Sequence, residues 1–120
     1  MPRVLIVDDE ASIRRSIRKM LERSGYDITE CGDGAEALSL IERASFDVIL
    51  TDLHLPNFDG LALAQALKTV PGTRPKVIVI SGDGQAGMME IATAIGAVAT
   101  LPKPFTRGDL IGVVEKALKS

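Results

Sequence analysis

The stretch VILTD at residues 48–52, followed by LHLPNFDG at residues 53–60, decides the fold. Its first four residues form a short, continuous apolar run, which is typical of a strand that is covered on both faces, as in a parallel sheet. The run ends in an acidic residue, and an Asp-Gly pair then precedes a helical pattern over residues 61–68. This stretch therefore predicts a buried strand, a loop and a helix.

The same pattern of a strand followed by a helix repeats along the chain. The predicted strands are residues 3–7, 27–31, 48–51, 77–80 and 97–101. The predicted helices are residues 12–23, 35–42, 61–68, 85–95 and 107–119. Because one helix separates each pair of successive strands, right-handed crossovers and a parallel sheet are expected. The sequence thus predicts an α/β fold: a (βα)5, doubly wound, five-stranded parallel sheet.

Length and composition favour one globular domain over residues 1–120 and exclude several classes of protein. The 120 residues are 46% hydrophobic, which is enough for a core. A net charge of −2 gives no reason to expect nucleic-acid binding. No apolar run approaches the roughly 20 residues of a membrane span. The single Cys31 cannot form an internal disulfide, which favours a reduced thiol in a cytoplasmic protein.

Polar and charged residues follow four of the five predicted strands. In doubly wound sheets, ligands bind beyond the carboxyl ends of the strands, so these residues are candidates for a site. In chain order they are Asp8, Asp9 and Glu10, then Asp52, then Ser81 and Gly82, and finally Lys103.

Taken singly, each candidate has an ordinary structural explanation, such as a helix cap for Asp8 or a solvated surface lysine for Lys103. Together they favour a site, because carboxylates at one edge raise each other's pKa values unless a cation lies among them. Mg²⁺ suits hard oxygen ligands and accepts one or two carboxylates together with phosphate oxygens. Asp52 can then act as a nucleophile that forms an aspartyl phosphate, while Lys103 and Ser81 contact phosphate oxygens. Gly82 leaves room for the phosphodonor.

Four motifs make the chain resemble the receiver domains of two-component response regulators: VLIVDDE at 4–10, LTDLHLPNFDG at 50–60, VIVISG at 77–82 and LPKPF at 101–105. The resemblance spans essentially the whole chain and implies the flavodoxin-like strand order 2-1-3-4-5. It also implies a phosphorylation-dependent signalling switch rather than a metabolic enzyme. Such a domain accepts a phosphoryl group from a sensor histidine kinase or a histidine phosphotransfer protein, and slowly dephosphorylates itself.

The resemblance assigns roles to individual residues. It makes Asp52 the phosphoacceptor, Asp9 a direct Mg²⁺ ligand and Asp8 a ligand through a water molecule. The third protein ligand is the backbone carbonyl two residues after the acceptor, which here belongs to His54. The imidazole of His54 is expected to modulate the lifetime of the phosphate, because a ring with a pKa near neutrality would lie at the mouth of the site.

The expected switch region departs from the family pattern. Ser81 matches the switch hydroxyl, but the position three residues before Lys103, where receivers usually have an aromatic residue, holds Thr100. Gly82 and Asp83 begin a segment that is either a simple turn or one that reorders when Ser81 is recruited. How phosphorylation is read out therefore stays open.

The resemblance has three further local consequences. The peptide bond between Lys103 and Pro104 is expected to be cis. Asp59 is expected to cap the helix that follows the acceptor, and Gly60 to adopt a positive φ.

Two surfaces are candidates for partner binding. The basic residues of the first helix, Arg14, Arg15, Arg18 and Lys19, form either a solvated face or the docking face for the kinase or phosphotransfer protein. The second candidate, for an output partner or a dimer, combines residues 85–95, 97–101 and 107–119. Neither surface carries a motif for nucleic acid or membrane.

Two other functions stay open on sequence grounds. A small phosphatase with an aspartyl nucleophile would have a general acid two residues after it, where this chain has His54. An adaptor with the receiver fold would not be phosphorylated, but the complete set of Asp8, Asp9, Asp52, Ser81 and Lys103 argues against it.

Overall fold

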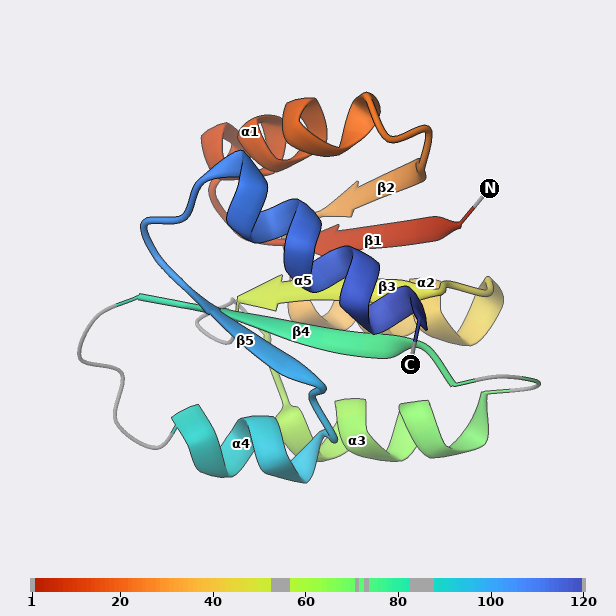
Figure 1. Cartoon of the computed structure of the whole chain (residues 1–120). Coiled ribbons are helices and arrows are strands. Elements are labelled where there is room, and N and C mark those ends of the chain that lie inside the picture. Colours follow the sequence, from red (N-terminus) through yellow and green to blue (C-terminus); the bar gives the residue numbers. More distant parts are fainter. Residues whose placement is uncertain (1, 53–56, 71, 73, 83–87, 120) are drawn as a thin grey trace.

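The computed structural model describes residues 2–52, 57–70, 72, 74–82 and 88–119. Within this part of the chain, five strands alternate with five helices (Figure 1). The strands are β1 (Arg3–Val7), β2 (Asp27–Cys31), β3 (Val48–Asp52), β4 (Lys76–Ser81) and β5 (Ala99–Pro102). The helices are α1 (Ala11–Glu22), α2 (Gly34–Arg43), α3 (Gly60–Thr69), α4 (Met88–Ala94) and α5 (Arg107–Lys119).

The five strands form one sheet in the order β2-β1-β3-β4-β5, and every strand pair is parallel. This confirms the predicted α/β fold and its strand order. In Figure 1 the arrowheads of the strands point toward one edge of the sheet, where the loops that carry the candidate residues begin.

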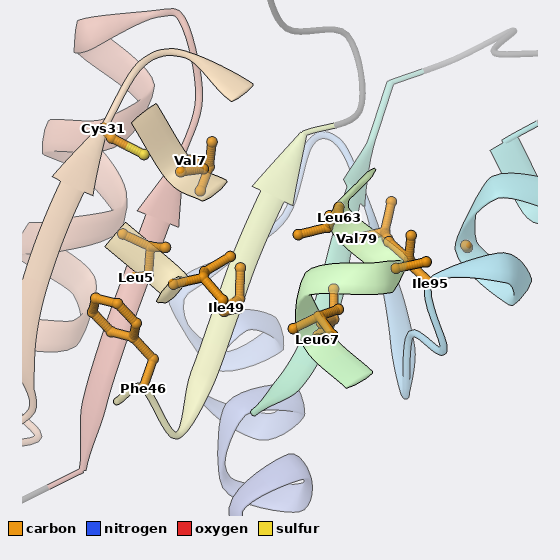
Figure 2. Close-up of a cluster of buried hydrophobic side chains, with 14 residues drawn as sticks. Leu5, Val7, Cys31, Phe46, Ile49, Leu63, Leu67, Val79 and Ile95 are labelled. Atoms are coloured by element: carbon orange, nitrogen blue, oxygen red, sulfur yellow. The ribbon is translucent and has the colours of Figure 1, made fainter. Parts of the chain in front are cut away.

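The sheet is covered by helices on both faces, which explains the continuous apolar strands. Leu5, Ile49 and Val79 pack in one core cluster with buried residues of α2, α3 and α4 (Figure 2). The alternate residues Ile6 and Leu50 pack in a second cluster with α1 and α5. Because successive side chains of a strand point to opposite faces, both sets must be apolar.

The start of β5 differs from the prediction. The sequence pattern places it at residue 97, but the amide of Ala97 still donates to the carbonyl of Ala92 in α4, at 2.9 Å. Gly96, with a φ of 73°, terminates the helix just before it. Strand β5 therefore begins at Ala99, two residues later than the apolar pattern suggests. The end of α4 is at Ala94 rather than 95, and residues 85–87 lie outside the described residues.

Asp59 caps α3 as expected, because its Oδ1 accepts hydrogen bonds from the amides of Leu61 and Ala62, at 3.0 and 3.1 Å. The expectation for Gly60 is wrong: this glycine is the first residue of α3, and the positive φ of 55° belongs to Asn57. Asparagine tolerates this left-handed conformation better than other residues with a Cβ.

The peptide bond between Lys103 and Pro104 is cis, as the resemblance implies. Among the described residues, no helix is long and apolar enough to cross a membrane.

Candidate functional site

The parallel register brings the candidate residues to one edge of the sheet. Val7 at the end of β1 lies beside Thr51 in β3, and Asp52 ends β3. Asp8 directly follows β1, and Lys103 directly follows β5. Side chains far apart in the sequence therefore meet beyond the carboxyl ends of the strands.

Lys103 joins two buried carboxylates. Its Nζ lies 3.1 Å from Oδ2 of Asp52 and 3.7 Å from Oδ2 of Asp8. Asp52 is only 6% exposed and Asp8 is fully buried. Burial acts to lower the pKa of Lys103, but the hydrogen bond with Asp52 and the charges of Asp52 and Asp8 outweigh it and raise this pKa. The lysine is therefore a stable positive charge between the two acids.

One oxygen of Asp8 has no hydrogen-bond partner among the described residues. Oδ1 accepts a hydrogen bond from the amide of Glu10 at 2.9 Å, but the buried Oδ2 accepts none from this part of the chain. Burial, the largest influence, raises the pKa of the Asp8 carboxyl, against the effect of that hydrogen bond. An unsatisfied buried carboxylate oxygen is costly, so a cation at this point would stabilise the site. Asp8, exposed Asp9 and exposed Glu10 offer carboxylate oxygens within 4.8 Å of one another. This donor set fits a hard divalent cation such as Mg²⁺.

The expected switch residues are only partly described. Ser81 ends β4, and its side chain lies outside the described part of the structure. Gly82 follows it with intermediate exposure. Thr100 is exposed on β5 and pairs with Val79 of β4. His54 and Asp83 lie outside the described residues, so their predicted roles are untested.

The basic residues of α1 divide into two pairs. Arg15 and Lys19 are exposed. Arg14 and Arg18 are half-buried, and both pair with the carboxylate of Glu30 in β2. The distance from Arg14 Nε to Glu30 Oε1 is 3.4 Å, and Arg18 Nε donates a hydrogen bond to Oε2. Sequence reasoning missed Glu30, because nothing in the local pattern shows that β2 lies beside this part of α1.

A second contact that sequence reasoning missed joins α2 to the segment before α3. Asn57 Nδ2 donates to Asp33 Oδ2 at 2.7 Å, while Oδ1 of Asp33 caps α2 by accepting from the amides of Ala35 and Glu36. The hydrogen bond from Asn57 is the main cause that lowers the pKa of Asp33. The Asp33-Gly34 pair signals only a turn, so its long-range partner was not predictable from it.

An open groove lies between α1 and the segment after β5. Its lining includes Lys103, the residue that contacts the two buried acids. The other lining residues are Ser12, Ile13, Ser16, Ile17, Met20, Pro104 and Phe105.

Comparison with known proteins identifies the family. The model of the response regulator receiver domain matches residues 4–115. The transcriptional regulatory protein PdtaR of Mycobacterium tuberculosis is 38% identical over 117 residues, which are 97% of this chain and 56% of PdtaR. The response regulator receiver protein CpdR of Brucella abortus is 31% identical over 118 residues, which are 98% of both chains. The chain thus spans little more than half the length of one relative and nearly all of another.

Solved structures agree in fold and sequence. A CheY-like response regulator receiver domain protein from Methanospirillum hungatei JF-1 superposes with a TM-score of 0.88 and 31% identity, covering 99% of this chain and 94% of that one. The receiver domain of the sensor histidine kinase PA1611 from Pseudomonas aeruginosa PAO1 has a TM-score of 0.86 and 29% identity, covering 99% and 98%. That structure has a magnesium ion coordinated in its active-site cleft. The chain described here therefore belongs to the response regulator receiver domain family of two-component signalling, a family of signalling domains rather than metabolic enzymes.

Proposed function

We propose that Asp52 is the phosphoacceptor of one receiver domain that extends over residues 1–120. The observation that carries this proposal is the contact of its buried carboxylate with Lys103 at 3.1 Å, beside a second buried acid. In the reaction, the phosphorus–nitrogen bond of a phosphohistidine donor breaks, and its electron pair stays on the imidazole, which takes up a proton. A phosphorus–oxygen bond forms to the Asp52 carboxylate.

The other residues proposed for the site have separate tasks. The Lys103 ammonium, held beside the acceptor, neutralises charge on a phosphoryl oxygen, and the Ser81 hydroxyl donates a hydrogen bond to another. Gly82, which has no side chain, leaves space for the donor. His54 and Asp83, which follow Asp52 and Ser81 by two positions each in the sequence, modulate how long the phosphate survives.

Mg²⁺ is the cofactor that these residues would hold. The proposed ligands are Asp9, Asp52 and the backbone carbonyl of His54, with Asp8 binding through a water molecule. The buried Oδ2 of Asp8, which has no hydrogen-bond partner among the described residues, and the nearby oxygens of Asp9 support this choice. When bound, the ion supplies positive charge to the phosphoryl oxygens.

The donor is a sensor histidine kinase or a histidine phosphotransfer protein, and we propose that it acts in the cytoplasm and docks on α1. Exposed Arg15 and Lys19 offer free charge there, and the groove between α1 and the segment after β5 leads to Lys103. Arg14 and Arg18 flank this docking face, but their pairing with Glu30 leaves them less charge for a partner.

The output surface is the face formed by α4, β5 and α5, as a partner site or a dimer contact. Val98, just before β5, is 48% exposed, and Thr100 is exposed within it. Thr100 replaces the usual aromatic residue, so a smaller change at this position would read out phosphorylation.

Intact mass spectrometry with a small phosphodonor tests the proposal. Incubation with Mg²⁺ and phosphoramidate, which mimics phosphohistidine, should add one phosphoryl group, and EDTA should prevent the addition. Asp52→Asn should abolish it. Asp27→Asn, which changes an exposed acid in β2, is the matched control and should leave the addition intact.

Three other results would overturn the proposal. Phosphorylation of Asp52→Asn would show that the acceptor is another residue. Steady turnover of phosphate esters by the wild-type protein would indicate a phosphatase. Absence of any mass change, together with no binding of beryllofluoride, would indicate an adaptor that is not phosphorylated.

A further inference from the structure

Arg14 connects α1 to the acidic end of β1. Its Nη1 donates a hydrogen bond to the backbone carbonyl oxygen of Asp8, while its Nε lies 3.4 Å from Glu30 Oε1. The side chain is 21% exposed, so it lies mostly within the protein rather than projecting as a docking residue. The guanidinium fork allows one arginine to hold a backbone carbonyl and a carboxylate together.

Two further polar atoms of Asp8, its amide nitrogen and Oδ1, also form hydrogen bonds. Its amide donates to the carbonyl of Cys31 in β2 at 3.1 Å, and its Oδ1 accepts from the amide of Glu10 at 2.9 Å. With the carbonyl held by Arg14, only Oδ2 has no hydrogen-bond partner among the described residues. The contacts of Asp8 therefore fix its backbone and one carboxylate oxygen, whereas the second oxygen has an ion pair with Lys103 at 3.7 Å but no hydrogen bond from the described residues.

Gly32 leaves the space that the Arg14 guanidinium occupies. A Cβ added at Gly32 would lie 2.9 Å from Arg14 Nη1, but 3.5 Å from the carbonyl oxygen of Asp8, which is an ordinary contact. An alanine here would displace the end of a flexible side chain and would spare the backbone of β1. Glu30 fixes the guanidinium from the other side, and Arg18 shares this carboxylate.

We propose that Arg14 is a positioning residue for the metal site: through its hydrogen bond to the Asp8 carbonyl, it sets the conformation in which Asp8 and Asp9 bind Mg²⁺. This rests on the proposed function, because that function makes the two acids metal ligands. Residues that orient metal ligands typically change metal affinity by about 10–100-fold when they are mutated. Arg14 contacts Asp8 only through the backbone carbonyl, so we expect its removal to lower the Mg²⁺ affinity by a factor near the lower end of this range.

The direction of the change in Mg²⁺ affinity on removing Arg14 distinguishes a positioning role from a purely electrostatic one. Arg14 is a positive charge near two acids, so its removal by Coulomb's law alone would tighten the binding of a divalent cation. Loss of positioning would weaken it. The two explanations thus predict opposite changes for Arg14→Ala.

The test measures the Mg²⁺ dissociation constant by NMR titration, following the amides of Asp9 and Glu10. Arg14→Ala should bind Mg²⁺ about tenfold more weakly than the wild type. Gly32→Ala, which keeps the charge but displaces the guanidinium, should weaken binding in the same direction. Arg23→Ala, which removes an exposed arginine just after α1, is the control and should match the wild type. The titration reports only folded molecules, so a change in global stability would not alter the constant.

The outcomes are distinguishable. Binding by Arg14→Ala that equals or exceeds the wild type would overturn the positioning role alone. Weaker Mg²⁺ binding by Arg14→Ala together with unchanged binding by Gly32→Ala would also overturn the positioning role. Mg²⁺ affinity would then not depend on the position of the Arg14 guanidinium. Failure of the wild type to bind Mg²⁺ would overturn the proposed metal site itself, and with it this role.

Discussion

Gly34→Ala should destabilise the protein, although alanine is normally the better helix residue. Gly34 is the first residue of α2 and is buried. A Cβ at this position would lie 2.6 Å from Cα of Phe58 and 2.7 Å from the carbonyl oxygen of Asn57. These are backbone atoms of the segment between the proposed acceptor and α3, so no change of side-chain rotamer can relieve the overlap.

The magnitude follows from two opposing effects. Replacing a helical glycine by alanine stabilises by about 0.5–1 kcal/mol. Inserting a carbon into a closely packed site destabilises by about 1–3 kcal/mol. The nearest atoms to a Cβ at Gly34 are backbone, including the Phe58 amide nitrogen at 2.9 Å, so the upper part of this range applies. The net loss in the free energy of unfolding should be about 2 kcal/mol.

Gly112→Ala is the matched control. Gly112 lies within α5, and a Cβ there would meet no atom of the described residues within 4 Å. The same substitution should therefore raise the free energy of unfolding by about 0.5–1 kcal/mol. Urea unfolding followed by circular dichroism measures both changes. The midpoint for Gly34→Ala should fall by about 1 M, given the usual dependence on urea for small proteins. Equal or greater stability of Gly34→Ala would refute the reasoning, because it would show that the Phe58 segment moves away at no cost.

Two further predictions concern buried ionisable groups. Burial raises the pKa of Asp8, so folding favours the protonated carboxyl. The protonated carboxyl therefore contributes its full stabilisation below the pKa of the unfolded chain. This contribution to the free energy of unfolding is lost as the pH rises through the raised pKa of the folded protein. Asp8→Asn should therefore unfold at higher urea concentration than the wild type at neutral pH without Mg²⁺, and a lower midpoint would contradict this. Cys31 is 3% exposed and burial raises its pKa to about 11, so its reaction with a disulfide reagent at mildly alkaline pH should be slow until urea unfolds the chain. Fast labelling of the folded protein would contradict the burial of this thiol.

The sequence by itself determined the architecture and the main residues of the candidate site. Continuous apolar runs such as 48–51 occur where both faces of a strand are covered, and the alternation with helices implies a parallel sheet. In a parallel sheet all carboxyl ends lie at one edge, so residues directly after the strands lie along that edge. This is why the sequence predicted that Asp52 and Lys103, 51 residues apart, lie at the same edge, although their direct hydrogen bond depends on the packing.

Only the tertiary structure decided which partners the remaining charged residues take. The pattern of α1 shows four basic residues but cannot show that Glu30 of β2 binds Arg14 and Arg18, because that depends on how the helix lies against the edge of the sheet. The contact of Asn57 with Asp33 joins two loops and has no local signal. Local sequence encodes periodicity and turn preference, whereas a specific pairing between distant side chains depends on register and packing. For that reason the structure changed the interpretation of the proposed docking surface most, and that of the sheet edge with the proposed phosphoacceptor least.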